Sequence, residues 1–390
     1  MGVPRRVRLM VLPRVLWGSV TLILLLLPAA EPICPEPCDC QQHQHLLCTN
    51  RGLRSVPKAA EPKDILTYSL GGNFIVNISA FDFHRLAGLQ RLDLQYNRIR
   101  SLHPKAFERL DRLEELYLGN NLLPALAPGT LSALAKLRIL YVNANEIGRL
   151  SAASFSGLSS LVKLRLDGNE LGSLGDSTFS GLPNLLYLHL ESNRIRWLSR
   201  GPLGNLEALD LSRNALTTLH PAAFSHLGRL RELSLRDNAL ATLPGELFAS
   251  SLALYRLELE GNAWSCDCRL RGLKHWLAAW HSQGRLLTVF VQCRLPSTLA
   301  GKYLDYLQDA QLLPPQDGGS CPDGDSPSLP SPEGLGGNSS AVGLPPGPPP
   351  ATSTARLMGA PIAASPTPPP PPSAIGLPLL ECHCFFRNHH

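Results

Sequence analysis

The segment Leu113-Glu-Glu-Leu-Tyr-Leu-Gly-Asn-Asn-Leu-Leu123 decides the fold of this chain. Its frame, L-x-x-L-x-L-x-x-N-x-L, recurs around nine asparagines: Asn73, Asn97, Asn121, Asn145, Asn169, Asn193, Asn214, Asn238 and Asn262. Seven of the eight steps between them are 24 residues, and the step from Asn193 to Asn214 is 21. A fixed period of this length indicates a repeat architecture, in which each unit packs against its neighbours.

Each repeat carries its own structural instructions. The L-x-L core alternates apolar and polar residues, which predicts a short, half-buried strand. The Asn turns the chain, and its amide can pair with backbone groups that the turn leaves unsatisfied, so the stacked amides are expected to form a ladder. An apolar residue follows about ten positions later and should fill the convex side of the core: Phe83, Phe107, Leu131, Phe155, Phe179, Phe224 and Phe248.

This is the leucine-rich repeat pattern, and it predicts an α/β solenoid. The nine repeats occupy residues 61–263 and should form a horseshoe with one parallel sheet lining its concave face. The 21-residue step removes three residues from the convex side. It is expected to disturb the stack between the strands near Leu188 and Leu209 and to interrupt the concave face there.

The first 30 residues have the composition of a signal peptide. Four arginines precede the apolar run of residues 15–27, and Ala29 and Ala30 suit cleavage. A signal anchor is the alternative, but the run is short for a bilayer span. Removing residues 1–30 lowers Lys+Arg from 36 to 32 against 31 Asp+Glu, so the net charge falls to about +1. No strongly basic region then favours nucleic-acid binding.

Cysteines flank the repeats on both sides. Residues 31–60 hold one group with the spacing C-x3-C-x-C-x7-C: Cys34, Cys38, Cys40 and Cys48. Residues 264–322 hold a second with the spacing C-x-C-x24-C-x27-C: Cys266, Cys268, Cys293 and Cys321. The open ends of a solenoid need caps, which an exported chain can build with disulfides. Spacing alone allows three connectivities in each cap. A zinc site, aided by His43 and His45, is the alternative in the N-terminal cap.

The C-terminal cap is followed by a segment of different composition. Within the cap, Leu273, Trp276, Leu277 and Trp280 have helical spacing, and their face should seal the last repeat. Residues 323–390 are rich in Pro, Ser and Gly and are expected to be disordered. The tail contains Cys382 and Cys384, for which no role is predicted. No later stretch is long and apolar enough to cross a membrane, so the chain as written is expected to be secreted.

The sequence also contains two candidate modification sites but no catalytic motif. The sequons at Asn77 and Asn338 predict N-glycosylation. No catalytic constellation is found, since the chain has no G-x-S-x-G, H-E-x-x-H, Walker or kinase signature. We therefore expect no enzyme, no cofactor and no metal site.

The concave face remains as the candidate binding surface. The residue between the two strand leucines of each repeat should point out of the sheet, which gives the row Ser69, Asp93, Tyr117, Tyr141, Arg165, His189, Asp210, Ser234 and Glu258. Tyr and Arg are enriched where binding energy concentrates. The predicted binding residues are those in and beside the middle of this row: Asp93, Tyr117, Tyr141, Arg165, Asp167, His189 and Glu191. Replacing both tyrosines with alanine is expected to weaken partner binding without lowering thermal stability.

Particular segments resemble the family of Toll-like receptor interactors with leucine-rich repeats. They include residues 66–75 and 115–121 in the repeats, and 266–272 and 281–293 in the C-terminal cap. The resemblance covers residues 31–321. It implies an accessory role in Toll-like receptor signalling during the innate immune response to bacterial lipopolysaccharide, with a Toll-like receptor complex as partner and lipopolysaccharide as a further ligand. Known caps of such proteins imply the disulfides Cys34–Cys40, Cys38–Cys48, Cys266–Cys293 and Cys268–Cys321.

The chain departs from that family in its length. The family has more repeats, a fibronectin-like domain, a transmembrane helix and a cytoplasmic tail. Residues 204–211 resemble a later family repeat joined to an earlier one, which suggests a shortened form, with a cell-surface location if the parent is anchored. The alternative function is that of a secreted matrix-associated or cell-adhesion protein.

Overall fold

The computed structural model describes residues 34–41, 44–58, 65–175, 177–198, 204–315 and 321. The predicted signal peptide, His43, and the Pro-rich tail with Asn338, Cys382 and Cys384 lie outside these residues. No helix among the described residues has the length and apolar character that a membrane span requires.

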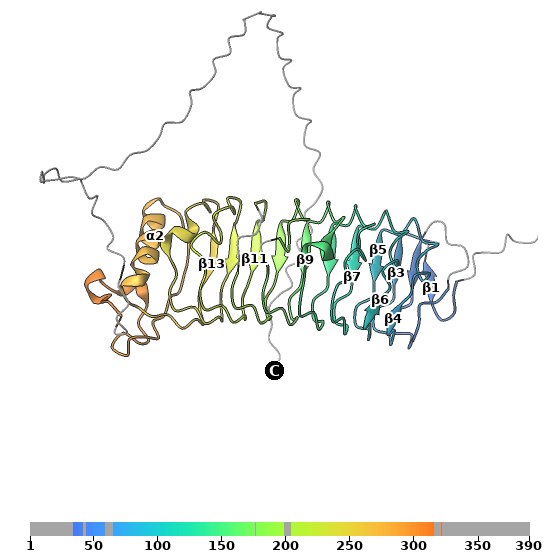
Figure 1. Cartoon of the computed structure of the whole chain (residues 1–390), viewed down its shortest axis with the longest axis horizontal. Coiled ribbons are helices and arrows are strands. Elements are labelled where there is room, and N and C mark those ends of the chain that lie inside the picture. The colour runs from blue at the N-terminus through green and yellow to red at the C-terminus, as the bar shows by residue number, and fades with distance from the viewer. Residues whose placement is uncertain are drawn as a thin grey trace, which may run out of the picture. The chain divides into compact units, whose positions relative to one another are not determined.

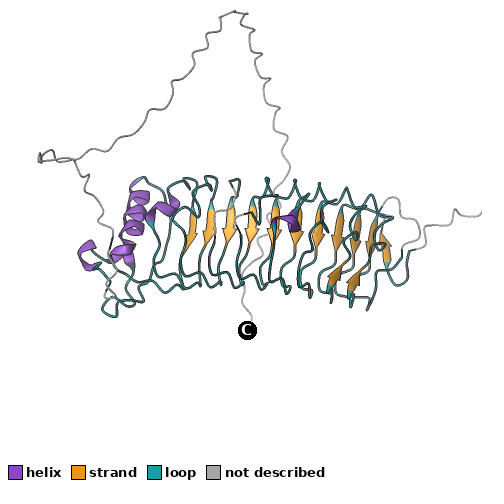
Figure 2. Cartoon of the chain, in the orientation of Figure 1, coloured by secondary structure: helices purple, strands orange, loops and turns teal. Residues whose placement is uncertain are grey.

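One eleven-stranded sheet runs through the described repeats and the N-terminal cap (Figures 1 and 2). The cap supplies β1 (Asp39–Gln41) and β2 (His45–Leu47), which pair antiparallel. From β2 onward every pair is parallel, and each repeat contributes one three-residue strand: β3 (Thr67–Ser69), β5 (Arg91–Asp93), β7 (Glu115–Tyr117), β8 (Ile139–Tyr141), β9 (Lys163–Arg165), β10 (Tyr187–His189), β11 (Ala208–Asp210), β12 (Glu232–Ser234) and β13 (Arg256–Glu258). The predicted solenoid with one parallel sheet is confirmed.

The opposite side of the solenoid is built from turns and very short elements. It includes a two-stranded sheet of β4 (Asn77–Ile78) and β6 (Ser101–Leu102), and the 3-10 helices η1 (Ala152–Phe155) and η2 (Gly245–Phe248). The α-helix that the structure describes, α2 (Arg271–Ser282), lies in the C-terminal cap, at the end of the stack opposite β1 (Figure 2). The helical part of the predicted α/β solenoid is therefore concentrated in a cap.

The core is a continuous column of leucines and phenylalanines between the two sides. Leu92, Leu116, Leu140 and Leu164, at the centres of successive strands, are fully buried. The predicted convex residues are also buried, with exposed fractions of 5% or less. The rings of Phe83 and Phe107 stack with centroids 6.1 Å apart, and those of Phe155 and Phe179 with centroids 5.8 Å apart. Each repeat thus completes the core of its neighbour.

The asparagine ladder forms as predicted. The Asn121 Nδ2 donates to the carbonyl oxygen of Leu118 in its own repeat and to that of Leu94 in the preceding one, both at 3.0 Å. Its Oδ1 accepts from the backbone N–H of Ile99 at 3.0 Å. The same pattern recurs along the array, for example at Asn169. Each amide satisfies backbone groups of two repeats and so fixes their spacing.

The expected disturbance at the 21-residue step is wrong for the concave side. Strands β10 and β11 pair in unbroken parallel register, with Leu188 opposite Leu209. Asn214 keeps the ladder by donating to the Leu190 carbonyl at 2.9 Å and accepting from the Ile195 N–H at 3.0 Å. Beneath this junction, an apolar hollow in the core is lined by residues of both sides, among them Leu188, Leu209 and Phe179. Backbone pairing fixes the strand side, whereas turns can lose residues without breaking a ladder.

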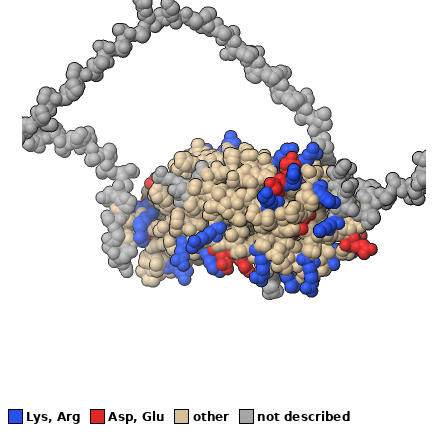
Figure 3. All heavy atoms as spheres, turned by 45° about the vertical axis from the view of Figure 1, so that its right-hand side comes forward, with Lys and Arg blue, Asp and Glu red and all other residues tan. Residues whose placement is uncertain are grey.

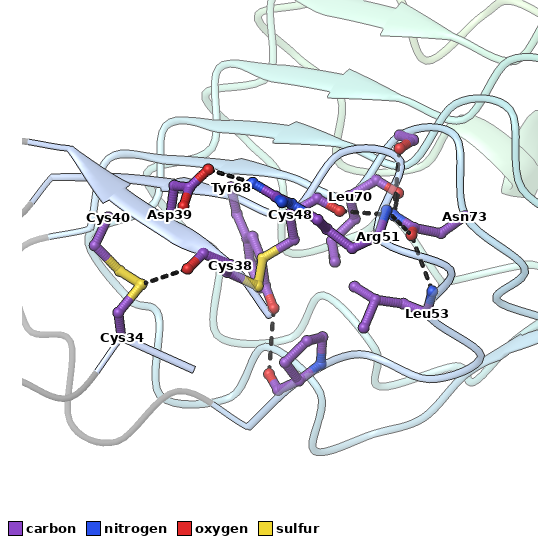
Figure 4. Close-up of a disulfide and its surroundings, with 12 residues drawn as sticks. Cys34, Cys38, Asp39, Cys40, Cys48, Arg51, Leu53, Tyr68, Leu70 and Asn73 are labelled. Atoms are coloured by element: carbon purple, nitrogen blue, oxygen red, sulfur yellow. Dashed lines mark hydrogen bonds and ion pairs between the residues drawn. A yellow bond between two sulfur atoms is a disulfide. The ribbon is translucent and has the colours of Figure 1, made fainter. Parts of the chain in front are cut away.

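Two disulfides hold the N-terminal cap (Figure 4). Cys34 pairs with Cys40, and Cys38 pairs with the fully buried Cys48. Beside them, Asn73 Oδ1 accepts from the N–H groups of Arg51 and Leu53, both at 3.0 Å. The first rung of the ladder is therefore made with the cap, which joins the cap to the first repeat.

The C-terminal cap covers the last repeat with α2. Cys266 pairs with Cys293 and Cys268 with Cys321. The ring of Trp276 lies 4.8 Å from that of Phe248 and 5.0 Å from that of Trp280, so this face of the helix seals the repeats as predicted. A side chain at Gly245 would clash with the carbonyl oxygen of Gly272, which explains why glycine occupies the contact between η2 and α2.

Within the C-terminal cap, Asp309 joins the 3-10 helix η5 (Asp309–Gln311) to α2. Its carboxylate lies 2.5 Å from Lys274 Nζ and 2.6 Å from His275 Nε2. These contacts lower the pKa of Asp309 from 3.8 to about 2. A carboxyl with a depressed folded pKa stabilises the fold above its unfolded pKa and loses that contribution as the pH falls toward 2.

We expect Asp309→Asn to lower the free energy of unfolding by about 0.3–1 kcal/mol at neutral pH, the range for an exposed ion pair. The difference from wild type should vanish near the folded pKa of about 2. Chemical unfolding at several pH values measures it, with the exposed Asp111→Asn as control. A difference that persists unchanged at low pH would contradict the assignment.

Candidate binding face

The predicted row of outward residues forms on the solvent side of the sheet, called the concave face below. Strand register places Tyr117 opposite Tyr141, Tyr141 opposite Arg165, Arg165 opposite His189, and His189 opposite Asp210. Neighbouring strands of a sheet lie about 4.8 Å apart, so these side chains form a continuous stripe. The 21-residue step does not interrupt it, contrary to expectation, because β10 and β11 remain in register.

The two tyrosines are the centre of a group of cations and aromatic rings. Their rings meet edge to face with centroids 5.0 Å apart. The guanidinium of Arg91 lies 4.8 Å from the centre of the Tyr117 ring, and that of Arg165 lies 5.4 Å from the centre of the Tyr141 ring. Lys163 Nζ approaches the Tyr141 ring to 5.6 Å. Such contacts hold large side chains in place and so reduce the entropy lost when a partner binds.

Tyr117 is more buried than the row predicts, with only 9% of its surface exposed. Its hydroxyl donates to Glu115 Oε2 at 2.7 Å, and burial, followed by this hydrogen bond, raises its pKa. This burial argues against the expectation that replacing both tyrosines leaves stability unchanged, because removal of the Tyr117 ring would open a packed site. The half-buried Tyr141 is the better probe of binding.

Arg165, Asp167 and Glu191 form a charged network beside Tyr141. Arg165 donates to both carboxylate oxygens of Asp167 at 2.8 Å, and its Nη2 lies 4.0 Å from Glu191 Oε1. The hydrogen bonds with Asp167 raise the pKa of the guanidinium. A forked Arg–carboxylate pair is rigid in both distance and angle. Arg165 is thereby positioned between the ring of Tyr141 and the acidic end of the stripe.

His189 and Asp210 extend the stripe across the short repeat. His189 Nδ1 lies 3.6 Å from Glu191 Oε2. Asp210 Oδ1 accepts from the Ser212 N–H at 2.8 Å. Burial, with the nearby charge of Glu191, raises the pKa of the Asp210 carboxyl.

The remaining predicted residues lie at different distances from this group. Asp93 is opposite Tyr117 in register, but its Oδ1 accepts from the Gln95 N–H at 2.9 Å, so that oxygen is used by the turn. Asn77, the predicted glycosylation site, is exposed on β4, where its Oδ1 accepts from Ser101 at 2.7 Å. Neither residue belongs to the central group.

Sequence reasoning missed Arg91, Glu115 and Lys163 as parts of the face. Each lies two residues before a row residue, on the same side of its strand, so the period-2 alternation that selected the row also predicts them.

Figure 3 shows Lys and Arg interspersed with Asp and Glu on a surface that otherwise consists largely of uncharged residues. In that view, neutral surface separates the groups of charged side chains.

Comparison with known proteins gives close relatives of this arrangement. The chain is 61% identical, over 77% of its length, to the human protein "TLR4 interactor with leucine rich repeats", and spans 49% of that relative. The chain thus covers about half the length of this relative. The match confirms the resemblance seen in the repeats and the C-terminal cap.

Two solved structures are also similar. A chain of the complex of Latrophilin 3, Unc5D and FLRT2 matches with a TM-score of 0.61 and 25% identity, covering 70% of this chain and 98% of that one. Human 5T4, the trophoblast glycoprotein, matches with a TM-score of 0.54 and 25% identity, covering 73% of this chain and 99% of that one.

The repeats themselves match a family model. The leucine rich repeat model matches residues 69–123, 111–171, 159–209 and 204–263. These matches join without a gap and span half of the chain. They coincide with strands β5 to β13 and with the asparagine ladder. The chain therefore belongs to the leucine-rich repeat family.

Proposed function

We propose that this protein is an extracellular, non-enzymatic recognition protein that associates with a Toll-like receptor complex through its concave face. The observation that carries the proposal is the 61% identity to a relative whose name describes it as an interactor of TLR4. The compartment is supported by the four disulfides, which form and persist in oxidising environments. We place the protein outside the cell on this basis.

The concave face is the proposed contact surface because it combines rigidity with suitable chemistry. Tyr and Arg dominate binding hot spots, and here Tyr141 and Arg165 are held by neighbours on both sides. A preorganised aromatic side chain loses little conformational entropy on binding. The mixed charges around it would fix the register of a protein partner.

The test measures binding of the full exported chain to the immobilised TLR4 ectodomain, with and without lipopolysaccharide. Wild type should bind, and Tyr141→Ala should raise the Kd at least about tenfold, the weakening expected for a hot-spot residue. A stronger interaction in the presence of lipopolysaccharide would support the proposed role in the response to that ligand.

Phe81→Ala is the matched control, because Phe81 is an aromatic residue with 74% of its surface exposed in a turn outside the sheet. It should bind like wild type. Absence of wild-type binding in both conditions would overturn the proposed function. Equal Kd values for Tyr141→Ala and wild type would remove the concave face from it and leave the association. Retention of the protein in extracellular matrix, without receptor binding, would favour the matrix-associated alternative.

A further inference from the structure

Three metal-ligating side chains converge on the concave face where the short repeat joins the array. His189 ends β10, Glu191 follows two residues later, and Asp210 ends β11 directly opposite His189. One ligand atom from each lies within 4.8 Å of the other two. Strand pairing and the alternation of side chains along each strand bring the three residues together.

One carboxylate oxygen of this group has no hydrogen-bond donor among the described residues. Glu191 Oε2 is inaccessible to solvent and accepts no hydrogen bond from any of the described residues. The contact nearest to a bond is His189 Nδ1 at 3.6 Å, which is beyond hydrogen-bonding range. A buried acceptor without a donor costs free energy, and a bound ion is one of the ways in which native structures satisfy it.

The local charge favours a cation of charge +2. Glu191 and Asp210 each carry one negative charge, and a metal-binding imidazole is neutral. The Nη2 of Arg165 lies 4.0 Å from Glu191 Oε1. The Arg165 guanidinium is held by both carboxylate oxygens of Asp167, however, so its positive charge is balanced by Asp167. The group therefore has a net charge of about −2, which a divalent ion would balance.

The ligand types identify the class of ion. One imidazole nitrogen with two carboxylates suits zinc and its first-row neighbours, whereas calcium prefers six to eight oxygen ligands. With bonds of about 2.0–2.2 Å, ligands of a tetrahedral zinc ion lie about 3.3–3.6 Å apart. The separation of His189 Nδ1 and Glu191 Oε2, 3.6 Å, is already close to this value. A carboxylate oxygen of Asp210 lies within 4.8 Å of the ligand atoms of the other two residues.

We propose that His189, Glu191 and Asp210 form a binding site for a divalent transition-metal ion, with zinc as the fitting member of that class. Three protein ligands leave one position of a tetrahedral ion open. The ion would cross-link β10 and β11 on the strand side of the repeat that is short on its convex side. The site stands independently of the proposed receptor association.

The test is calorimetric titration of the full exported chain, first stripped with a chelator, with zinc and separately with calcium. Tail residues such as His389 and His390 are also potential zinc ligands. The titration of each variant is therefore compared with that of wild type, to find which binding event the substitution removes. Asp210→Asn and Glu191→Gln should each weaken one zinc-binding event at least about tenfold, the lower range for even an indirect perturbation of a metal site. Calcium should not bind there.

Matched variants separate this site from the others. His226→Ala, an exposed histidine of a following repeat, and the double variant His389→Ala/His390→Ala should retain the event. Zinc should raise the Tm of wild type but not of Asp210→Asn, whose side chain can still accept from Ser212 in the metal-free fold. The proposal is overturned if the Asp210 and Glu191 variants bind zinc as wild type does, or if the tail variant abolishes all binding.

Discussion

Asn145→Ala is expected to lower the free energy of unfolding by about 3–5 kcal/mol, because it leaves several buried backbone groups without hydrogen-bond partners. The Asn145 Nδ2 donates to Leu118 O at 3.0 Å and Val142 O at 3.1 Å, and its Oδ1 accepts from the Leu123 N–H at 3.0 Å. Alanine offers none of these partners. Because 7% of Asn145 is exposed, water has little access to replace them.

The measurement is chemical unfolding of the full chain followed by circular dichroism. Asn184→Ala is the matched control, since Asn184 is exposed and its side chain donates to Ser159 O at 2.8 Å. It should cost less than about 0.5 kcal/mol, as surface substitutions usually do. A similar loss for both asparagines would mean that the ladder contributes no more than an ordinary surface amide.

Removal of the Cys266–Cys293 disulfide should have the second largest effect. The bridge closes a loop with a sequence separation of 27, and both residues are buried, at 1% and 3% exposure. Chain entropy alone predicts a loss of about 3–4 kcal/mol for the double variant Cys266→Ala/Cys293→Ala. The loss of stability should be concentrated in the cap. Each unit of a solenoid contacts only its neighbours, so a change at one end mainly destabilises that end.

Hydrogen exchange locates that loss. The amides of Cys266 and Leu304, which donate to Leu295 O and Val291 O, should exchange faster in the double variant, while those in β7 and β8 should change little. Cys34→Ala/Cys40→Ala is the comparison: its sequence separation is 6, and the same model predicts about 2 kcal/mol. A uniform loss of protection along the whole array would contradict a local role for the C-terminal bridge.

Much of the fold follows from the period of the sequence. The spacing of the asparagines specifies which leucines share a side, and the strand register follows because each repeat adds one identical unit. The unbroken strand register across the 21-residue step did not follow, because sequence spacing does not show whether a deletion on the convex side also displaces the strands. The ladder bonds of Asn214 hold the strand side in register.

For the candidate site, the sequence predicts which face of the sheet the side chains occupy, but not how they pack against one another. Alternation places Tyr117, Tyr141, Arg165 and His189 on one face. It does not show that Arg91 covers Tyr117, that Glu115 takes its hydroxyl, or that Tyr117 is consequently buried. The convergence of Asp210 with His189 and Glu191 was hidden for a related reason: it depends on cross-strand pairing between residues of different repeats.

The continuous register across the short repeat has a consequence for how such proteins change over evolutionary time. A junction between two repeats of unequal length can be inherited as long as the strand pattern and the asparagine survive, because the junction then meets the same backbone partners on either side. Insertions and deletions in the turns are thereby decoupled from the strand face of the sheet. An array of this kind can gain or lose modules, and so lengthen or shorten its concave face in discrete increments, without redesigning the side chains of the modules that remain.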